Sequence, residues 1–187
     1  MAKKRVVFLG PPNSGKGTQA VRLAALLGVP AISTGEMLRA AVTAGSELGK
    51  RVEGTLASGQ LVGDDLMAEV VTARLAEADA AAGFLLDGYP RTAPQAATLE
   101  GILLGQKASL DHVLLVDAPE EVLVKRALGR GRVDDTEEVV RERLAVYRRQ
   151  TSPLVDYYRQ QGLLREIDGN QPIETVEAAI RAAVEIV

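Results

Sequence analysis

The sequence of 187 residues contains no cysteine, which excludes disulfide bonds and thiolate metal sites. Its single histidine, His112, is too few for a histidine-based zinc site. No apolar run approaches the ~20 residues that span a bilayer. The apolar part of the N-terminal segment, VVFL, is far shorter than the core of a signal peptide. We therefore expect a cytoplasmic protein without zinc and without a membrane partner.

The sequence also has no excess of positive charge. The formal net charge is -3, whereas a general nucleic-acid binder usually carries a strong basic excess, so we expect no nucleic-acid partner. Hydrophobic residues make up 47% and charged residues 25%, values typical of one compact domain with a real core. Of the 22 basic residues 16 are arginine, the better bidentate partner for phosphate.

Short β-branched runs alternate with longer helical stretches along the chain. This alternation predicts an α/β fold with a parallel sheet and helices on both faces. The expected strands cover residues 5–9, 29–33, 84–86, 113–116 and 163–167. The expected helices cover residues 15–27, 34–60 with breaks at Gly45 and Gly59, 64–78 capped by Asp64 or Asp65, 92–104, 119–128, a stretch from 136 interrupted near Pro153, and 173–187.

The strongest motif is VVFLGPPNSGKGT, in which Gly10, Gly15 and Lys16 have the spacing G-x-x-x-x-G-K. It lies directly between an expected strand and an expected helix, the context that a phosphate-binding loop requires. Small residues let backbone N–H groups surround a phosphate, and the helix adds the positive end of its dipole. Gly17 follows the lysine, so the hydroxyl comes one residue later than usual, at Thr18.

The G-K-G-T variant and four later segments resemble the adenylate kinase family. The five segments occur in the family's order, cover nearly the whole chain and are GPPNSGKGTQ, ISTGEMLRAA, GQLVGDDL, GFLLDGYPRTAPQ and GRGRVDDTEEVVRERL. The resemblance implies a three-layer P-loop NTPase fold with a five-stranded parallel sheet. It also implies a single domain, residues 1–187, with a segment that binds the nucleoside monophosphate (33–62) and a short lid (129–135).

The same resemblance implies Mg²⁺-dependent phosphoryl transfer between ATP and AMP, in a monomer whose partners are ATP, AMP and ADP. Asp87 would hold Mg²⁺ through water. The implied catalytic residues are Lys16, Arg91, Arg130, Arg132 and Arg143. The implied ATP site comprises Asn13, Ser14, Gly15, Lys16, Gly17, Thr18, Arg126, Arg130 and Gln171. The implied AMP site comprises Thr34, Arg39, Gln60, Leu61, Val62, Gly88, Tyr89, Pro90, Arg91, Gln95, Arg132 and Arg143.

Several positions depart from the family pattern or have no implied role. Asn13 stands where the loop commonly has glycine, and Asn tolerates the left-handed backbone well. Gly63 replaces a common proline, and the lid is unusually short. Asp134 and Asp135 are expected to cap the next helix or pair with arginines, and His112 to be structural or exposed. Gly129 and Gly131 fit a lid hinge.

Three alternatives compete with the ATP:AMP reaction. A UMP/CMP kinase would share nearly all these motifs, although Thr34 and Gln95 favour adenine. A P-loop switch without a monophosphate substrate would leave the arginines and the D-G-Y-P-R-T segment without a purpose. A catalytically inactive family member would have Asn13 as the lesion.

Overall fold

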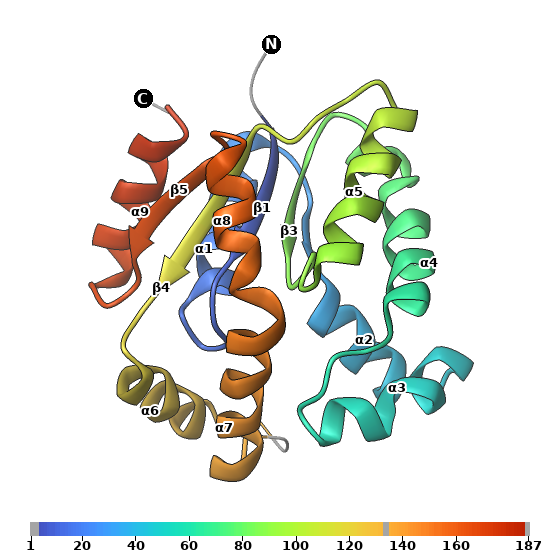
Figure 1. Cartoon of the computed structure of the whole chain (residues 1–187), viewed down its shortest axis with the longest axis vertical. Helices are drawn as coiled ribbons and strands as arrows, with labels where there is room; N and C mark the ends of the chain where they lie inside the picture. Colours follow the sequence, from blue (N-terminus) through green and yellow to red (C-terminus); the bar gives the residue numbers. More distant parts are fainter. Residues whose placement is uncertain (1–3, 133–134, 186–187) are drawn as a thin grey trace.

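The computed structural model describes residues 4–132 and 135–185 and contains a five-stranded parallel sheet (Figure 1). The strand order is β2-β3-β1-β4-β5, so β1 lies at the centre, where Val6 is aligned with Leu85 on β3 and with His112 on β4. The strands are β1 (Arg5–Leu9), β2 (Ala31–Ser33), β3 (Phe84–Asp87), β4 (His112–Asp117) and β5 (Leu164–Asp168). The predicted parallel sheet is confirmed. Strand β2 starts two residues later than expected, because the Val29 N–H donates to Ala24 at the end of the preceding helix.

Alternate residues of the strands point to opposite faces of the sheet, and each face is covered by its own helices. Val6 and Phe8 pack with helices α1 (Lys16–Leu27) and α9 (Ile173–Ala183). Val7 and Leu9 belong to the core on the other face, which includes α5 (Ala93–Gly105) and α8 (Pro153–Gln160). The period of two residues in a strand thus produces the three-layer architecture that Figure 1 shows.

Two long connections between strands contain the remaining helices. The chain between β2 and β3 forms α2 (Thr34–Thr43), α3 (Glu47–Ala57), α4 (Asp64–Leu75) and a 3₁₀ turn, η1 (Ala78–Ala80). The chain after β4 forms α6 (Glu120–Arg130), α7 (Glu137–Val146) and a π-helical segment, η2 (Tyr147–Thr151), that leads into α8. Helices α6 and α7 share a small core that includes Leu123, Ala127, Val140 and Leu144. Helices α2 and α3 and helices α6 and α7 lie on either side of the lower part of Figure 1, whereas α4 packs beside α5.

Two local expectations were wrong. Gly63, not Asp64 or Asp65, is the N-cap of α4, and both aspartates lie in its first turn. Gly129 does not end α6, which continues to Arg130 because a glycine is tolerated inside a helix and the left-handed turn comes at Gly131.

Of the two alternatives left open for Asp135, pairing with arginines is confirmed and capping of α7 is wrong. Thr136 caps α7 by accepting from the Val139 N–H, whereas Asp135 pairs with arginines, the alternative that had been left open. Asp134 lies outside the described residues. His112 is buried, 1% exposed, consistent with a structural role rather than an exposed one.

Candidate nucleotide site

A cavity of about 660 Å³ lies at the carboxyl ends of the strands, where open α/β sheets bind their ligands. It is lined by the loop after β1, by α2, by the segment before α4, by the turn after β3 and by residues of α6, α7 and η2. Segments from both halves of the chain therefore surround one space. Most of the predicted site residues lie on its wall.

The predicted phosphate loop has the backbone that a phosphate cradle needs. Gly10 has φ 137°, and a Cβ there would lie only 2.1 Å from the Val116 carbonyl oxygen on β4. Asn13 has φ 67°, so it adopts the left-handed conformation that asparagine tolerates well. Helix α1 begins at Lys16 with no acidic residue in its first turn. Its positive end is thus free to attract an anion.

Polar side-chain atoms of the loop are held without partners inside this cradle. The amide atoms of Asn13 and the hydroxyl of Ser14 are buried and form no hydrogen bond within the described chain. Asn13 lines the cavity, whereas Ser14 does not. A buried polar atom without a hydrogen bond is costly, so a bound phosphate that accepts from the Asn13 amide nitrogen would offset part of this cost.

Lys16 folds back over the loop, where its Nζ donates to the Pro11 carbonyl at 2.6 Å. Burial is the main cause that lowers the pKa of Lys16 to about 8, and the charges of Arg91 and Arg130 lower it further, while Asp87 opposes them. A phosphate beside the ammonium would favour its charged form. The surroundings of Lys16 therefore disfavour its charged form until an anion binds beside it.

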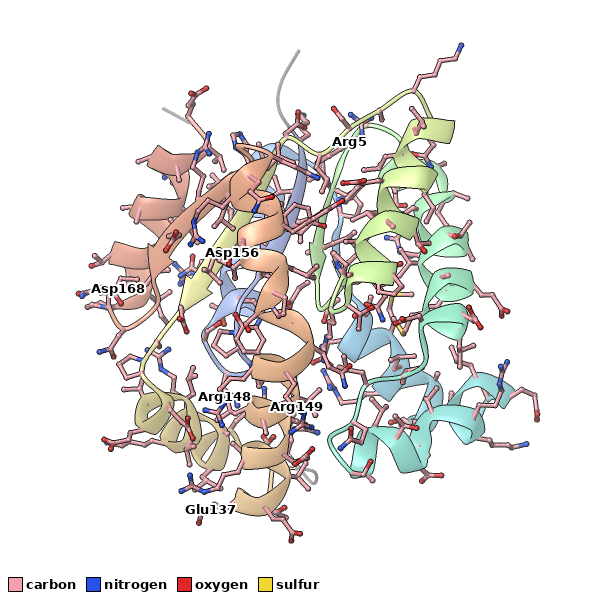
Figure 2. The ribbon with its side chains drawn as sticks, viewed as in Figure 1. Arg5, Glu137, Arg148, Arg149, Asp156 and Asp168 are labelled. Carbon is pink, nitrogen blue, oxygen red and sulfur yellow. The ribbon has the colours of Figure 1, made fainter. Side chains whose placement is uncertain are left out.

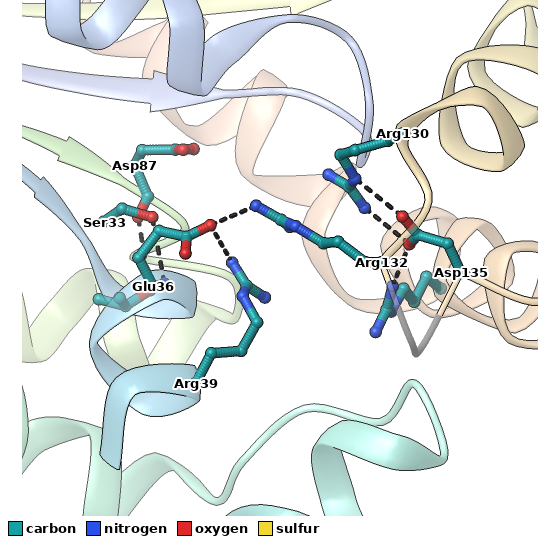
Figure 3. A network of polar contacts seen from close by, with 9 residues as sticks. Ser33, Glu36, Arg39, Asp87, Arg130, Arg132 and Asp135 are labelled. Carbon is teal, nitrogen blue, oxygen red and sulfur yellow. Dashed lines mark hydrogen bonds and ion pairs between the residues drawn. The ribbon is translucent and has the colours of Figure 1, made fainter. Parts of the chain in front are cut away.

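A shared carboxylate joins two arginines across the cavity. Oε1 of Glu36, in the first turn of α2, accepts from Arg39 at 2.6 Å and also from Arg132 (Figure 3). The hydrogen bond from Arg39 is the main cause that lowers the pKa of Glu36. Arg132 follows α6 in sequence, so this contact connects the segment after β2 with the segment after β4.

A second carboxylate holds two further arginines. Asp135 accepts from Nε and Nη2 of Arg130 at 2.8 and 2.7 Å, and from Arg143 at 3.1 Å (Figure 3). Burial alone would raise the pKa of Asp135, but the hydrogen bond and charge of Arg130, with the charge of Arg143, lower it. Both arginines line the cavity. Asp135, which does not itself line the cavity, thus holds the side chains of Arg130 and Arg143 in place.

Arg91 lies in the turn after β3 and lines the cavity. Its Nε donates to the Gly88 carbonyl at 2.8 Å, in a turn where Gly88 has φ 88°. A Cβ at Gly88 would lie 2.7 Å from the Thr34 hydroxyl and 2.9 Å from Nη2 of Arg91. Burial, and then the charges of Arg39 and Arg143, lower the pKa of Arg91 despite Asp87 nearby. Only glycine leaves room for this packing.

Arg126 and Gln171 belong to the ATP half of the predicted site. Arg126 lines the cavity and donates to the Gly169 carbonyl at 2.9 Å, which anchors it to the turn after β5. Gln171 is exposed and donates to Asp168 at 2.8 Å. Figure 2 shows Asp168 at the outer edge of the sheet. Gln171 does not line the cavity.

Gln95 and Gln60 lie on the AMP side of the predicted site. Gln95 is 2% exposed and lines the cavity, with its Oε1 accepting from the Arg91 N–H at 2.8 Å and its Nε2 donating to Asp64 at 2.8 Å. Gln60 donates to Glu142 on α7 at 2.9 Å. Gln60 and its two neighbours, Leu61 and Val62, all line the cavity.

Asp87 ends β3 and lines the cavity beside the phosphate loop. A Cβ on Gly17 would lie 3.3 Å from its Oδ2, so the unusual glycine after the lysine leaves room beside this carboxylate. One carboxylate next to a phosphate cradle fits Mg²⁺, which usually takes one or two carboxylates and keeps several waters. Within residues 4–132 and 135–185, no three His, Cys, Asp or Glu side chains gather as a metal-binding group.

A few predicted residues are not on the cavity wall, and some lining residues were not predicted. Ser14, Tyr89, Pro90 and Gln171 do not line it, and Tyr89 is completely buried in the core. Unpredicted lining residues include Glu36, Met67, Tyr147 and Thr151. The spacing of Glu36 and Arg39 by three residues on a helix was a signal for their pairing. Arg148 and Arg149 (Figure 2) instead pair with Glu120 and Glu142 and do not line the cavity.

The fold and the site together define a P-loop nucleotide-binding protein of the kinase type. A phosphate-binding loop lies on one side of the cavity, and arginines from other segments line the rest of its wall. A family model described as adenylate kinase matches residues 8–163. The chain belongs to the adenylate kinase family.

Relatives of nearly equal length support this assignment. The chain is 49% identical over 184 residues to an adenylate kinase of Stenotrophomonas maltophilia, covering 96% of this chain and 98% of the relative. It is 50% identical over 179 residues to one of Nocardia farcinica, covering 95% and 98%. It is 47% identical over 181 residues to adenylate kinase 1 of Synechocystis, covering 97% of each.

The reaction predicted from the sequence is therefore confirmed: the chain is an ATP:AMP phosphotransferase that catalyses ATP + AMP = 2 ADP. This assignment decides against a P-loop switch and favours AMP over UMP or CMP as the acceptor. Among the described residues, no helix is long and apolar enough to cross a membrane.

Proposed function

We propose that the cavity binds ATP against the phosphate loop and AMP against α2 and the turn after β3, with their phosphates facing each other. One observation carries the proposal: among the described residues, seven basic side chains from both halves of the chain line this single cavity. They are Lys16, Arg39, Arg91, Arg126, Arg130, Arg132 and Arg143. Two nucleotides that repel each other electrostatically need such a concentration of positive charge to come together.

On the ATP side, the loop amides and the N-terminus of α1 hold the β and γ phosphates, and Lys16 adds a mobile charge. Asn13, Ser14, Gly15, Gly17 and Thr18 complete this cradle. Arg126 supports the nucleotide from the turn after β5, and Arg130 contacts the phosphates from α6. Gln171 lies over the ATP adenine, outside the cavity.

On the AMP side, Arg39 and Arg91 bind the phosphate, with Thr34 and Gly88 packed against Arg91. Main-chain groups of Gln60, Leu61 and Val62 contact the adenosine. Tyr89 and Pro90 support the site from the core side. Gln95 reads the adenine edge, since its amide offers one acceptor and one donor. Arg132 and Arg143 contact AMP or the phosphoryl group in transfer.

Mg²⁺ is the proposed cofactor, held through water by Asp87. When bound, it would neutralise charge on the transferring phosphates. The residues of the chain position the two nucleotides in line and stabilise charge. The attacking phosphate of AMP is already an anion, so no general base is needed.

The segments 33–62 and 129–135, of which residues 133–134 lie outside the described part of the chain, are proposed to close over the nucleotides, which would exclude water and so prevent hydrolysis of ATP. Closure of a lid in adenylate kinase is a standard example of such gating. Gly131, with φ 71° at the end of α6, provides a flexible joint for the lid. A monomeric state, a cytoplasmic location and a site without zinc remain predictions.

The experiment compares initial rates for AMP, UMP, CMP and GMP with ATP and Mg²⁺, using the wild type, Lys16→Ala and Arg91→Ala. We expect AMP to be the preferred acceptor. Lys16→Ala and Arg91→Ala should each lower the rate by roughly 10²-fold or more, the effect of removing a preorganised charge. Wild-type rates in both variants would contradict the assigned roles. A wild type that transfers to no monophosphate would support the alternative that Asn13 inactivates the enzyme.

A further inference from the structure

The amide of Gln95 is held in one orientation by two partners with opposite hydrogen-bonding character. The Asp64 carboxylate, which only accepts at neutral pH, receives Nε2 at 2.8 Å. The Arg91 backbone N–H, which only donates, is received by Oε1 at 2.8 Å. A flip of the amide would place oxygen against carboxylate and NH₂ against N–H. Both contacts would then be repulsive, so the orientation is fixed.

Asp64 is itself positioned by the same small network. Its Oδ1 also accepts from the Thr92 hydroxyl at 2.9 Å, and Thr92 caps α5 by accepting from the Gln95 N–H. The carboxylate therefore connects the first turn of α4 to the first turn of α5. Asp65, the next residue in the same turn of α4, is exposed and makes no such contact with Gln95 among the hydrogen bonds of the described residues.

The fixed amide has one N–H and one lone pair left, and Gln95 lines the cavity while it is only 2% exposed. Adenine offers a donor at N6 and an acceptor at N1, which match a carboxamide held with its oxygen toward N6. Hypoxanthine has nearly the same shape but offers an acceptor at O6 and a donor at N1. A carboxamide that could turn over would accommodate either base.

We propose that Asp64 is a specificity-determining residue: by locking the Gln95 amide, it makes the AMP site select a 6-amino purine and reject a 6-oxo purine. This inference rests on the proposed reading of adenine by Gln95. Asp64 acts through Gln95 and is thus a positioning residue. Without these partners, the side-chain amide of Gln95 could face the edge of the base in either of its two orientations. Asp64 and the Arg91 N–H together impose the orientation that favours adenine.

The test measures kcat/KM for AMP and for IMP at saturating ATP and Mg²⁺ in five proteins. These are the wild type, Asp64→Ala, Asp64→Asn, Asp65→Ala and Gln95→Ala. Asp65→Ala is the matched control, because it removes an equal charge from the same turn of α4. Asp64→Asn keeps the size of the side chain and can present either an oxygen or an NH₂ to Gln95, so it carries the test if Asp64→Ala fails to fold.

We expect the AMP/IMP ratio of kcat/KM to fall by about tenfold in Asp64→Ala, the effect of one net hydrogen bond, and to fall in Asp64→Asn. The ratio in Asp65→Ala should equal that of the wild type. In one contrary outcome, kcat/KM falls by the same factor for AMP and IMP in both Asp64 variants, while Gln95→Ala lowers the AMP/IMP ratio. Asp64 would then have only a structural role, and this inference would be wrong while the role of Gln95 stands. An unchanged ratio in Gln95→Ala would overturn the adenine-reading role of Gln95 as well.

Discussion

Glu36 and Arg132 are in hydrogen-bonding contact across the nucleotide cavity although 96 residues separate them in sequence. Glu36 lies in the first turn of α2, and Arg132 follows α6. The same carboxylate oxygen also accepts from Arg39. The Glu36 carboxylate is therefore hydrogen-bonded to both Arg39 and Arg132, which are proposed to bind a substrate phosphate.

Glu36→Gln should lower the KM for AMP by about two- to fivefold. Glutamine keeps the size of the side chain but no longer competes as an anion for Arg39 and Arg132. The Glu36 side chain is 58% exposed, and exposed ion pairs are worth at most about 1 kcal/mol, which limits the effect to this range. Steady-state kinetics with AMP varied at saturating ATP provides the measurement.

The control for this change is Glu47→Gln, which removes a carboxylate that pairs with Lys50 on the exposed face of α3. It should leave the KM for AMP at its wild-type value. If Glu36→Gln raises that KM, the carboxylate assists AMP binding instead of competing with it.

Asp135→Ala should destabilise the protein by roughly 2 kcal/mol, since it removes a carboxylate 1% exposed and leaves Arg130 and Arg143 adjacent and unneutralised. Asp156→Ala breaks an exposed pair with Arg159 and should change stability by less than about 1 kcal/mol. Urea unfolding of the two variants checks the contrast. Equal losses of stability would contradict the structural role of Asp135.

The lowered pKa of Asp135 also sets the direction of a pH effect. Because its folded-state pKa lies below the unfolded value, its contribution is present above the unfolded pKa, about 3.9, and is lost as the pH falls through the folded-state pKa. The stability difference between wild type and Asp135→Ala should therefore shrink below about pH 4. A difference that grows in acid would mean that the sign is wrong.

Gly88→Ala and Gly101→Ala should change stability in opposite directions. At Gly88, with φ 88°, a Cβ would lie 2.7 Å from the Thr34 hydroxyl, so we expect a loss of at least about 1 kcal/mol and a higher KM for AMP. Gly101 lies within α5 with no atom within 4 Å of the added Cβ, so alanine should stabilise the helix by about 0.5–1 kcal/mol. Thermal unfolding would show the two signs, and a stabilised Gly88→Ala would contradict the packing.

ATP binding should take up protons at alkaline pH through Lys16. Burial lowers the pKa of Lys16 to about 8 in the free protein, and bound phosphates should raise it again. ATP affinity should then weaken above pH 8, approaching about tenfold per pH unit at most. Isothermal titration calorimetry at pH 8.5 in buffers of different ionisation enthalpy would measure the uptake.

Lys16→Met is the control for the calorimetric experiment, because it keeps the aliphatic chain without a titrating group. Its residual binding should show no proton uptake at pH 8.5. If the wild type also takes up none, another group balances the charge, and the electrostatic account of Lys16 is wrong.

The layered fold and the phosphate loop could be predicted because local signals were sufficient. The 13 residues VVFLGPPNSGKGT contain a strand, a glycine-rich turn and a helix start, and the structure has β1 and α1 on either side of the turn. Asn13 adopts the left-handed backbone that its residue type was expected to tolerate.

The acidic partners of the site could be predicted only in part, because tertiary packing decides between local alternatives. Asp135 stands before a helix, where local chemistry favours a cap, yet the packing of α6 against α7 brings Arg130 and Arg143 to it and leaves the cap to Thr136. Asp64 was expected only to cap the helix that begins there, but its partner Gln95 lies 31 residues away. Nothing in the sequence shows such a long-range pairing.

The most direct test of the account supplies only ADP and Mg²⁺ to the purified protein and follows all phosphates by ³¹P NMR. If the loop and the facing arginines bring two nucleotides together, ATP and AMP should form in equal amounts without release of inorganic phosphate, and Lys16→Ala should slow this strongly. Inorganic phosphate as the main product, or no ATP from the wild type, would contradict the claim that one cavity joins a donor and an acceptor nucleotide.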